Sequence, residues 1–250
     1  MKALVFAAGL GTRLAPITDT MPKALVPIAG QPLLAHVLRK LVRSGCSEIV
    51  VNVHHFPEQI QAFLASQEWG ARISVSDESA LLLETGGGIL HARPLLEPCH
   101  GPFLVHNVDI ISNVNLQELQ QSARRDALAT LVVSERQTSR YLLFSDDMRL
   151  LGWTDIASGE VRSPYPGLDP TRCRKYAFAG IHSLSPRIFT AFGAHGFSGR
   201  FPIMDFYLKA CATEPIFGFV PPALEMVDVG KFDTLEQAER TAAKILLQNR

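Results

Sequence analysis

The chain has 250 residues, 47% of them hydrophobic, which is enough material for one large domain or two small ones with a sizeable core. It carries 24 basic and 24 acidic residues and no net charge, so we expect neither nucleic acid nor a membrane surface as a partner. The four cysteines are scattered without a CxxC pair, which argues against a zinc site or a disulfide framework and fits a reducing cytoplasm.

The N-terminal apolar run is short and stops at a glycine loop followed by Arg13 and two prolines. A secretory signal has a longer apolar stretch, and a membrane-spanning helix needs about 20 apolar residues. We therefore expect a cytoplasmic protein without a signal or a membrane span.

Short apolar runs typical of β-strands recur along the first half of the chain, and stretches with helical spacing lie between them. This alternation predicts β-α-β units around a mostly parallel sheet. The expected strands are "ALVFAA", "EIVVNV", "RISVSD", "PFLVHNVD" and "ATLVVSE".

Three helices are expected in the same half. The first begins near Pro32 and ends at Gly45, with Leu34, Val37, Leu38 and Leu41 on one face. The second covers about 57–66, and the third, "NLQELQQSARR", has Asn115 as its N-terminal cap.

The pattern changes after about residue 135, where "RYLLF", "LLGWTDI" and "EVRSP" resemble hairpin strands. We expect an inserted layer that covers a pocket, and "SPYPGLDP" as a surface loop, with a mobile lid as the alternative. A strand at "KYAFAGIHSL" follows, then helices near 186–192 and 202–212. A last helix runs from Thr234 onward and is capped by Asp233 and Glu236.

The stretch "AAGLGTRL" follows the first expected strand, where a glycine loop exposes N–H groups to phosphate. The P-loop pattern GxxxxGK[ST] fails, because Leu14 and Ala15 occupy its glycine and lysine positions. The dinucleotide pattern GxGxxG matches Gly9 and Gly11 but also has Leu14 at its third glycine.

The longer segment "AAGLGTRLAPITDTMPKALVPIAGQPLL" resembles the signature of sugar-1-phosphate nucleotidyltransferases nearly position for position. The resemblance implies an α/β fold, a Rossmann-like (GT-A-like) three-layer sandwich with a mixed, mostly parallel central sheet. It implies a single domain over 1–250, with a nucleotide-binding part at about 1–135 and a sugar-binding part at about 136–250. We expect no C-terminal acetyltransferase or β-helix extension of the kind some relatives carry.

Physical chemistry gives this segment a role at a triphosphate. Gly9 and Gly11 allow the backbone to approach the ligand closely, Arg13 offers a forked donor to the β and γ phosphates, and Lys23 places a charge at the α phosphate. With Asp109, the last two are the expected catalytic residues. The expected nucleotide contacts are Ala8, Gly9, Gly11, Thr12, Arg13, Lys23, Glu84, Gly86, Gly87 and Asn107.

Four of these contacts come from later segments. "LLLETGGGIL" resembles the nucleobase loop of the family, with backbone groups near Gly86 and Gly87 at the base edge, Glu84 nearby, and a helix opening after it. Asn107 precedes the acid Asp109 at the end of an apolar strand, where ligands of open α/β sheets gather.

Two aspartates are the expected metal ligands, and the expected cofactor is Mg²⁺, which uses few carboxylates together with phosphates and water. Asp109 follows Val108, where the family usually has glycine. Asp228 lies in "EMVDVGKFDTLEQAE", which resembles the family segment W-x-D-x-G-T, with Glu225 or Met226 near the tryptophan position and Lys231 in place of threonine.

The resemblance also implies a sugar site. Ala179 and Gly180, in "KYAFAGIHSL", are the small residues that let the sugar approach the backbone, and Arg140 is a further candidate for the sugar phosphate. His54, His55 and His106 show no metal-ligand spacing, so we expect structural or supporting roles for these histidines.

The implied reaction joins a nucleoside triphosphate and a sugar-1-phosphate, releases pyrophosphate and forms a nucleotide-diphospho-sugar. A uridylyl transfer from UTP to N-acetylmuramate-1-phosphate is the favoured form. Guanylyl transfer from GTP to mannose- or heptose-1-phosphate is the first alternative, and a non-catalytic sugar-nucleotide sensor is the second. The oligomeric state stays open.

Overall fold

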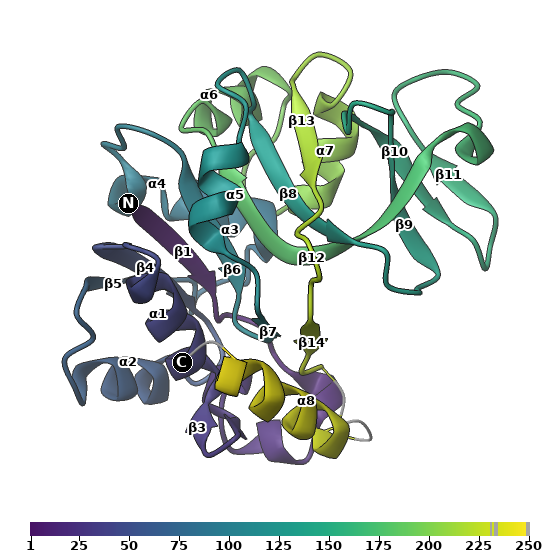
Figure 1. Cartoon of the computed structure of the whole chain (residues 1–250). Helices are drawn as coiled ribbons and strands as arrows, with labels where there is room; N and C mark the ends of the chain where they lie inside the picture. Colours follow the sequence, from purple (N-terminus) through teal and green to yellow (C-terminus); the bar gives the residue numbers. More distant parts are fainter. Residues whose placement is uncertain (231, 233–234, 249–250) are drawn as a thin grey trace.

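The computed structural model describes residues 1–230, 232 and 235–248, and these residues form a large sheet with helices on both faces (Figure 1). The strands are β1 Lys2–Phe6, β2 Pro27–Ile28, β3 Gln31–Pro32, β4 Glu48–Val53, β5 Arg72–Asp77, β6 Phe103–Asn107, β7 Ile110–Ser112, β8 Ala129–Ser134, β9 Arg140–Phe144, β10 Leu150–Asp155, β11 Glu160–Arg162, β12 Arg174–Leu184, β13 Ile216–Phe219 and β14 Met226–Asp228. The α-helices are α1 Leu33–Arg43, α2 Pro57–Ala65, α3 Glu84–His91, α4 Arg93–Leu96, α5 Leu116–Ser122, α6 Ile188–Ala194, α7 Ile203–Ala210 and α8 Leu235–Gln248. Short 3₁₀ helices lie at Thr12–Leu14, Ile17–Asp19, Lys23–Leu25 and Pro170–Arg172.

The main sheet of the described residues has ten strands in the order β11-β10-β9-β12-β6-β1-β4-β5, with β8 beside β12 and β13 beside β8. β1 pairs in parallel with β4 and β6, whereas β12 is antiparallel to β6, β8 and β9. Within this sheet, β10 and β12 run against the direction that the other strands share. The expected mixed, mostly parallel sheet is confirmed.

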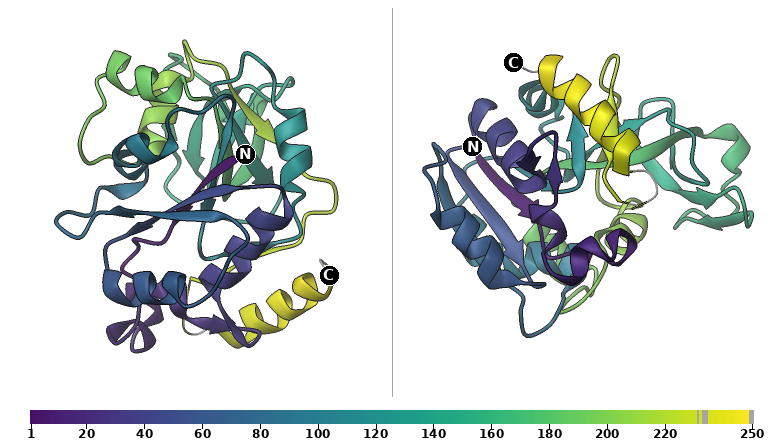
Figure 2. Two further views of the ribbon diagram at one scale, coloured as in Figure 1. Left: turned by 90° about the vertical axis from the view of Figure 1, so that its left-hand side faces the viewer. Right: turned by 90° about the horizontal axis from the view of Figure 1, so that it is seen from below.

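Side chains alternate between the two faces of each strand and so feed two separate cores. Ala3 and Val5 of β1 pack with α1, α2, α5 and α8, and Leu4 packs on the opposite face with α3, α4, α6 and α7. Two helical layers with a sheet between them make the three-layer sandwich that the sequence predicts. Helix α8 also packs against β14, β7 and β2, and it lies along the outside of the molecule (Figure 2).

The helices expected in the first half are confirmed. Helix α1 buries its apolar stripe, and Gly45, with φ +91°, follows its end. Helix α2 begins at Pro57. Asn115 caps α5, because its Oδ1 accepts hydrogen bonds from the N–H groups of Gln117 and Glu118 at 3.0 and 3.1 Å. The capping role expected for Asp233 falls outside the described residues.

The second half contains the expected hairpin strands, but the expectation of an inserted layer is wrong. β9, β10 and β11 continue the main sheet, where they form the wing at the right of Figure 1. β12 is 11 residues long and extends beyond β6, so its Arg174–Tyr176 segment has a free edge that pairs with β9.

The proline-rich loop 163–170 is anchored to the end of α7 by a hydrogen bond, which the Tyr165 hydroxyl donates to the Cys211 carbonyl at 3.1 Å. Among the described residues, no helix combines the length and apolar character needed to cross a membrane.

Candidate active site

The two glycines in the loop after β1 have different structural roles. Gly11 has φ +69°, and a Cβ built on it would lie 2.8 Å from Thr18 Cγ2. Its carbonyl accepts hydrogen bonds from the Leu14 N–H at 2.7 Å and the Thr18 hydroxyl at 2.9 Å, which hold the backbone in this turn. The positive φ and the lack of space for a Cβ are what require glycine here. A Cβ on Gly9 would meet nothing within 4 Å, and Gly9 is exposed. The structure therefore needs Gly11 for its backbone and leaves Gly9 open to a ligand.

Lys23 is buried although it is charged, with 8% of its surface exposed. It opens a 3₁₀ turn after Pro22, and its ammonium donates to the carboxylate of Asp109. A buried charge is tolerated when it is paired and hydrogen-bonded, and the carboxylate fulfils both conditions here. Two residues from distant segments that the sequence predicts as catalytic are thus in direct contact.

Asp109 and Asp228 are brought together by a small two-stranded sheet. Asp109 lies in the turn between β6 and β7, and β7 pairs antiparallel with β14 so that Ile110 is opposite Asp228. The Val229 N–H donates to the Asp109 carbonyl at 2.9 Å, which extends this pairing by one step. Backbone register therefore places both aspartates at the same end of the ribbon.

The charges around Asp228 show that this end is crowded. Burial and the neighbouring Asp109 carboxylate raise the pKa of Asp228, while Lys23, Arg13 and Arg136 act in the opposite direction. A Cβ built on Gly230 would lie 2.7 Å from Asp228 Oδ1 and 3.5 Å from Arg13 Nη2. Arg13 therefore lies beside the second aspartate, and glycine at 230 leaves room for both side chains.

The carboxylates of Asp109 and Asp228 fit a Mg²⁺ site. Mg²⁺ is held by one or two carboxylates and completes its octahedron with substrate phosphates and water. Repulsion between the two carboxylates, which contributes to the raised pKa of Asp228, is what a divalent cation would relieve. Within 1–230, 232 and 235–248, no group of three or more His, Cys, Asp or Glu side chains is placed to hold a metal ion, so the fit is to a site completed by substrate.

Val108, the departure from the family's glycine, is accommodated in the core. Its side chain is 5% exposed, and its N–H donates to the Phe6 carbonyl at 3.2 Å. Glu225, one candidate for the family's tryptophan position, forms an ion pair with Lys244 of α8, and Met226, the other, packs against the core around α8. Lys231 lies outside the described residues.

The three-glycine run forms the first turns of α3, and each glycine admits a different neighbour. A Cβ would lie 2.2 Å from the Phe201 ring at Gly86, 2.3 Å from the Gly199 carbonyl at Gly87, and 2.8 Å from a Glu78 oxygen at Gly88. The N–H groups of Gly86 and Gly87 both donate to the Phe201 carbonyl, at 2.9 and 3.1 Å. These two amides are therefore occupied within the protein, so a nucleobase at this loop would use other backbone groups near Gly86 and Gly87.

Glu84 starts α3 with φ +62° and pairs with Arg200 at 2.9 Å. The segment 199–203 is thus a second wall of this loop, and the sequence pattern did not indicate it. The neighbouring Thr85 hydroxyl accepts a hydrogen bond from the Ile203 N–H at 2.9 Å, which fastens the start of α7 to the start of α3.

On the sugar side, the structure brings Gly180 to Asn107 but separates the other candidates. Gly180 has φ +72°, and a Cβ there would lie 2.9 Å from Asn107 Nδ2. Ala179 faces the core that contains α1, so its small side chain serves packing. Arg140 is largely exposed and pairs across the hairpin with Asp155 at 3.4 Å.

Arg136 is a residue that the sequence interpretation missed. It follows β8, its Nη2 donates to the Phe178 carbonyl at 3.3 Å, and its charge acts on Asp228. The signal was its place in the loop after a strand whose carboxyl end faces the same side as that of β6.

The histidines make contacts within the protein. His54 Nδ1 lies 2.6 Å from the Glu78 carbonyl, His55 Nε2 lies 3.1 Å from the Thr18 carbonyl, and His106 Nδ1 lies 2.7 Å from the Asn107 carbonyl. These contacts fit the expected structural roles.

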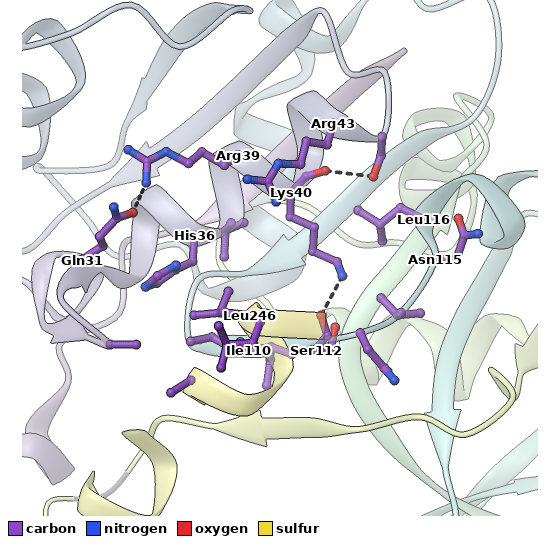
Figure 3. A pocket seen from close by; sticks show the side chains of 18 of the residues that line it. Gln31, His36, Arg39, Lys40, Arg43, Ile110, Ser112, Asn115, Leu116 and Leu246 are labelled. Atoms are coloured by element: carbon purple, nitrogen blue, oxygen red, sulfur yellow. Dashed lines mark hydrogen bonds between the residues drawn. The ribbon is translucent and has the colours of Figure 1, made fainter. Parts of the chain in front are cut away.

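A separate cavity of about 660 Å³ lies between α1, β7 and α8 (Figure 3). Lys40 extends across it and donates to the Ser112 carbonyl at 2.7 Å, and burial lowers the pKa of Lys40 to about 8. The described residues that line the cavity do not include Lys23, Asp109 or Asp228. β7 borders the cavity on one side, but the cavity is not part of the aspartate site.

The match to a known protein family includes three of these site residues. The family model described as nucleotidyl transferase matches residues 2–143, which include Arg13, Lys23 and Asp109. The N-acetylmuramate alpha-1-phosphate uridylyltransferase of Caulobacter vibrioides is 36% identical over 231 residues, covering 90% of each chain. The chain belongs to the sugar-1-phosphate nucleotidyltransferase family.

Further matches to this nucleotidyltransferase agree. A mannose-1-phosphate guanyltransferase of Hypocrea jecorina is 35% identical over 145 residues, covering 56% of this chain and 40% of the relative. A crystal structure of a putative glucose-1-phosphate thymidylyltransferase from Bacillus anthracis superposes with a TM-score of 0.79 at 17% identity, covering 97% of this chain and 95% of the other. The second comparison supports the fold alone.

Proposed function

We propose that this nucleotidyltransferase transfers a uridylyl group from UTP to a sugar-1-phosphate, with N-acetylmuramate-1-phosphate as the first candidate acceptor. The observation that carries the proposal is the similarity over nine-tenths of the chain to an uridylyltransferase of that substrate. The convergence of Arg13, Lys23, Asp109 and Asp228 supports the chemistry.

The reaction needs an anionic nucleophile, and the substrate supplies it. A phosphate monoester has a second pKa of about 6, so the sugar phosphate is largely a dianion at neutral pH and needs no general base. One of its oxygens forms a bond to the α phosphorus, and the bond from that phosphorus to the bridging oxygen breaks. The departing pyrophosphate takes the electron pair.

The side chains of this chain position and neutralise the reacting groups. Lys23 contacts Asp109, and its ammonium would neutralise charge at the α phosphate. Arg13 lies beside Asp228, and its guanidinium would offer two parallel donors to the departing phosphates. Asp109 and Asp228 would hold Mg²⁺, which neutralises charge on the phosphate oxygens when bound. Gly9 leaves the backbone open to the phosphates.

We propose further that residues 1–135 bind the nucleotide and that residues 136–250 bind the sugar. The two parts would meet where Gly180 lies against Asn107. Ala8 and Thr12 would supply backbone contacts in the phosphate loop, and Arg140 stays a sugar-site candidate with weaker support than Arg136.

Guanylyl transfer to mannose- or heptose-1-phosphate is the second candidate, favoured by the similarity over 145 aligned residues to a mannose-1-phosphate guanyltransferase. A non-catalytic sensor has less support, because the lysine and both aspartates are present and adjacent.

A matrix of nucleoside triphosphates and sugar-1-phosphates, assayed for pyrophosphate release with and without Mg²⁺, tests these proposals. We expect the highest kcat/KM with UTP and N-acetylmuramate-1-phosphate, and loss of turnover with EDTA. A Lys23→Met variant is the matched negative control. A preference for GTP would select the second candidate, and nucleotide binding without turnover for any pair would support the sensor.

A further inference from the structure

A buried amide and a buried carboxyl group join the phosphate loop to the start of α3. Asn52 lies at the carboxyl end of β4, opposite Phe6 of β1, and Glu78 comes directly after β5. Each residue is 2% exposed. Polar side chains this deep in a protein are costly unless their hydrogen bonds are made, so their partners identify what they hold.

The partners form one continuous chain of hydrogen bonds. Asn52 Oδ1 accepts from the N–H groups of Ala7 and Ala8, at 2.7 and 3.2 Å. Asn52 Nδ2 donates to Glu78 Oε1 at 2.8 Å, and Glu78 Oε2 accepts from the Leu83 N–H at 3.1 Å. The backbone that opens the phosphate loop is thereby linked to the backbone that opens α3.

Gly88 lies against this chain of hydrogen bonds and has no space for a side chain. A Cβ there would lie 2.8 Å from Glu78 Oε1 and 3.2 Å from Asn52 Nδ2, which is closer than a methyl group tolerates. Of the three consecutive glycines, this one leaves room for the Asn52–Glu78 pair.

We propose that Asn52 and Glu78 are positioning residues for the nucleotide, setting the separation between the phosphate loop and the α3 loop so that both ends of one nucleoside triphosphate are held at once. This inference rests on the proposed function and on the family resemblance, which together assign the phosphate loop to the triphosphate and the α3 loop to the base. Neither side chain needs to touch the substrate. Their effect should appear in the KM for the nucleotide and leave the KM for the sugar-1-phosphate unchanged.

The pairing suggests a test in which donor and acceptor are exchanged. Both oxygens of Glu78 accept a hydrogen bond, one from Asn52 Nδ2 and one from the Leu83 N–H. In Glu78→Gln, the NH₂ group replaces one of these oxygens and faces another donor, so one hydrogen bond is lost. In the double variant Asn52→Asp with Glu78→Gln, the aspartate accepts from Ala7, Ala8 and the Gln amide, while the Gln oxygen accepts from Leu83. Every hydrogen bond is restored with the direction of the central one reversed.

We expect Glu78→Gln to raise the KM for the nucleotide roughly tenfold or more, the scale of one unsatisfied buried hydrogen bond, with an unchanged KM for the sugar-1-phosphate. The double variant should return the nucleotide KM toward that of the wild type. Glu58→Gln, an exposed glutamate on α2, is the matched control and should change neither KM.

Thermal unfolding of each variant separates positioning from folding. A role in folding alone would lower the midpoint of Glu78→Gln without a selective change in the nucleotide KM, and that result overturns the proposal. A double variant that folds but keeps the raised KM overturns it too. If the double variant does not fold, Gly88→Ala takes its place, and an unchanged nucleotide KM in that variant refutes the inference.

Failure of the proposed function has a different signature. If the wild type turns over no pair of substrates, the reaction assignment fails, and the same variants are then compared by calorimetric titration with UTP. Weaker binding by Glu78→Gln and recovery in the double variant would still support the positioning role, and equal binding would overturn it.

Discussion

Two histidines buried beneath the active-site strands should make the protein sensitive to mild acid. Burial lowers the pKa of His106 and of His182 to about 3, from an ordinary value of 6.5. His182 Nδ1 lies 2.6 Å from the Tyr207 hydroxyl, within the core under β12. Both rings stay neutral in the folded protein at pH 5, whereas the unfolded chain takes up protons below pH 6.5.

The direction of the effect is therefore a loss of stability as the pH falls. Between pH 7 and pH 5 each histidine costs about 2 kcal/mol of unfolding free energy, and the pair about 4 kcal/mol. The size depends on the unfolded pKa alone, because both folded values lie well below 5.

Urea unfolding at the two pH values measures this cost. His182→Asn should reduce the pH-dependent loss by about 2 kcal/mol, whatever its effect on stability at pH 7. Tyr207→Phe is the control, since it removes the hydroxyl partner but keeps the titrating ring, and its loss should match that of the wild type. A His182→Asn variant that loses as much stability between pH 7 and pH 5 as the wild type would refute the reasoning.

The remaining predictions concern the active site. Asp228→Asn should raise the thermal midpoint at pH 7, because the raised pKa means that folding disfavours the ionised carboxyl group, and it should lower kcat about 100-fold or more; a lower midpoint in differential scanning calorimetry would contradict this. Gly11→Ala should lose roughly 1–3 kcal/mol of unfolding free energy, because of the positive φ and the close contact with Thr18 in the following turn. Gly9→Ala should change the unfolding free energy by no more than about 0.5 kcal/mol in urea titrations. Arg136→Ala should lower kcat/KM about tenfold, and Arg140→Ala should lower it less. Steady-state kinetics that show the reverse order would make Arg140 the better-supported sugar-site residue.

The N-terminal motif could be predicted in detail because its residues are close in sequence and each has a chemical reason. Lys23 and Asp109 were assigned from separate motifs, and the structure puts them in contact. What local pattern could not supply is which neighbour fills the space beside a small residue. The sequence assigns the glycines at 86 and 87 to a ligand loop, but it does not reveal that Phe201 and Gly199, far along the chain, fill the space where their Cβ atoms would lie.

The two arginines after β8 show the same limit. Arg140 and Arg136 are four positions apart, and their type and spacing do not distinguish them. The strand boundary does, because Arg140 belongs to β9 and is used in a cross-strand pair with Asp155, while Arg136 lies in the loop toward Asp228. The sequence predicts this hairpin, but it does not show that the fold brings the loop after β8 close to Asp228, so the sequence alone could not make that choice.

The aspartate ribbon also makes the site depend on two segments that are far apart in the chain. β7 ends at Ser112 and β14 begins at Met226, so the ribbon joins two strands with a long segment of chain between them. A nascent or proteolysed fragment that ends ahead of Met226 retains the phosphate loop, Lys23 and Asp109, yet lacks the opposing acid. Assembly of the aspartate pair therefore depends on the folding of the whole segment between β7 and β14.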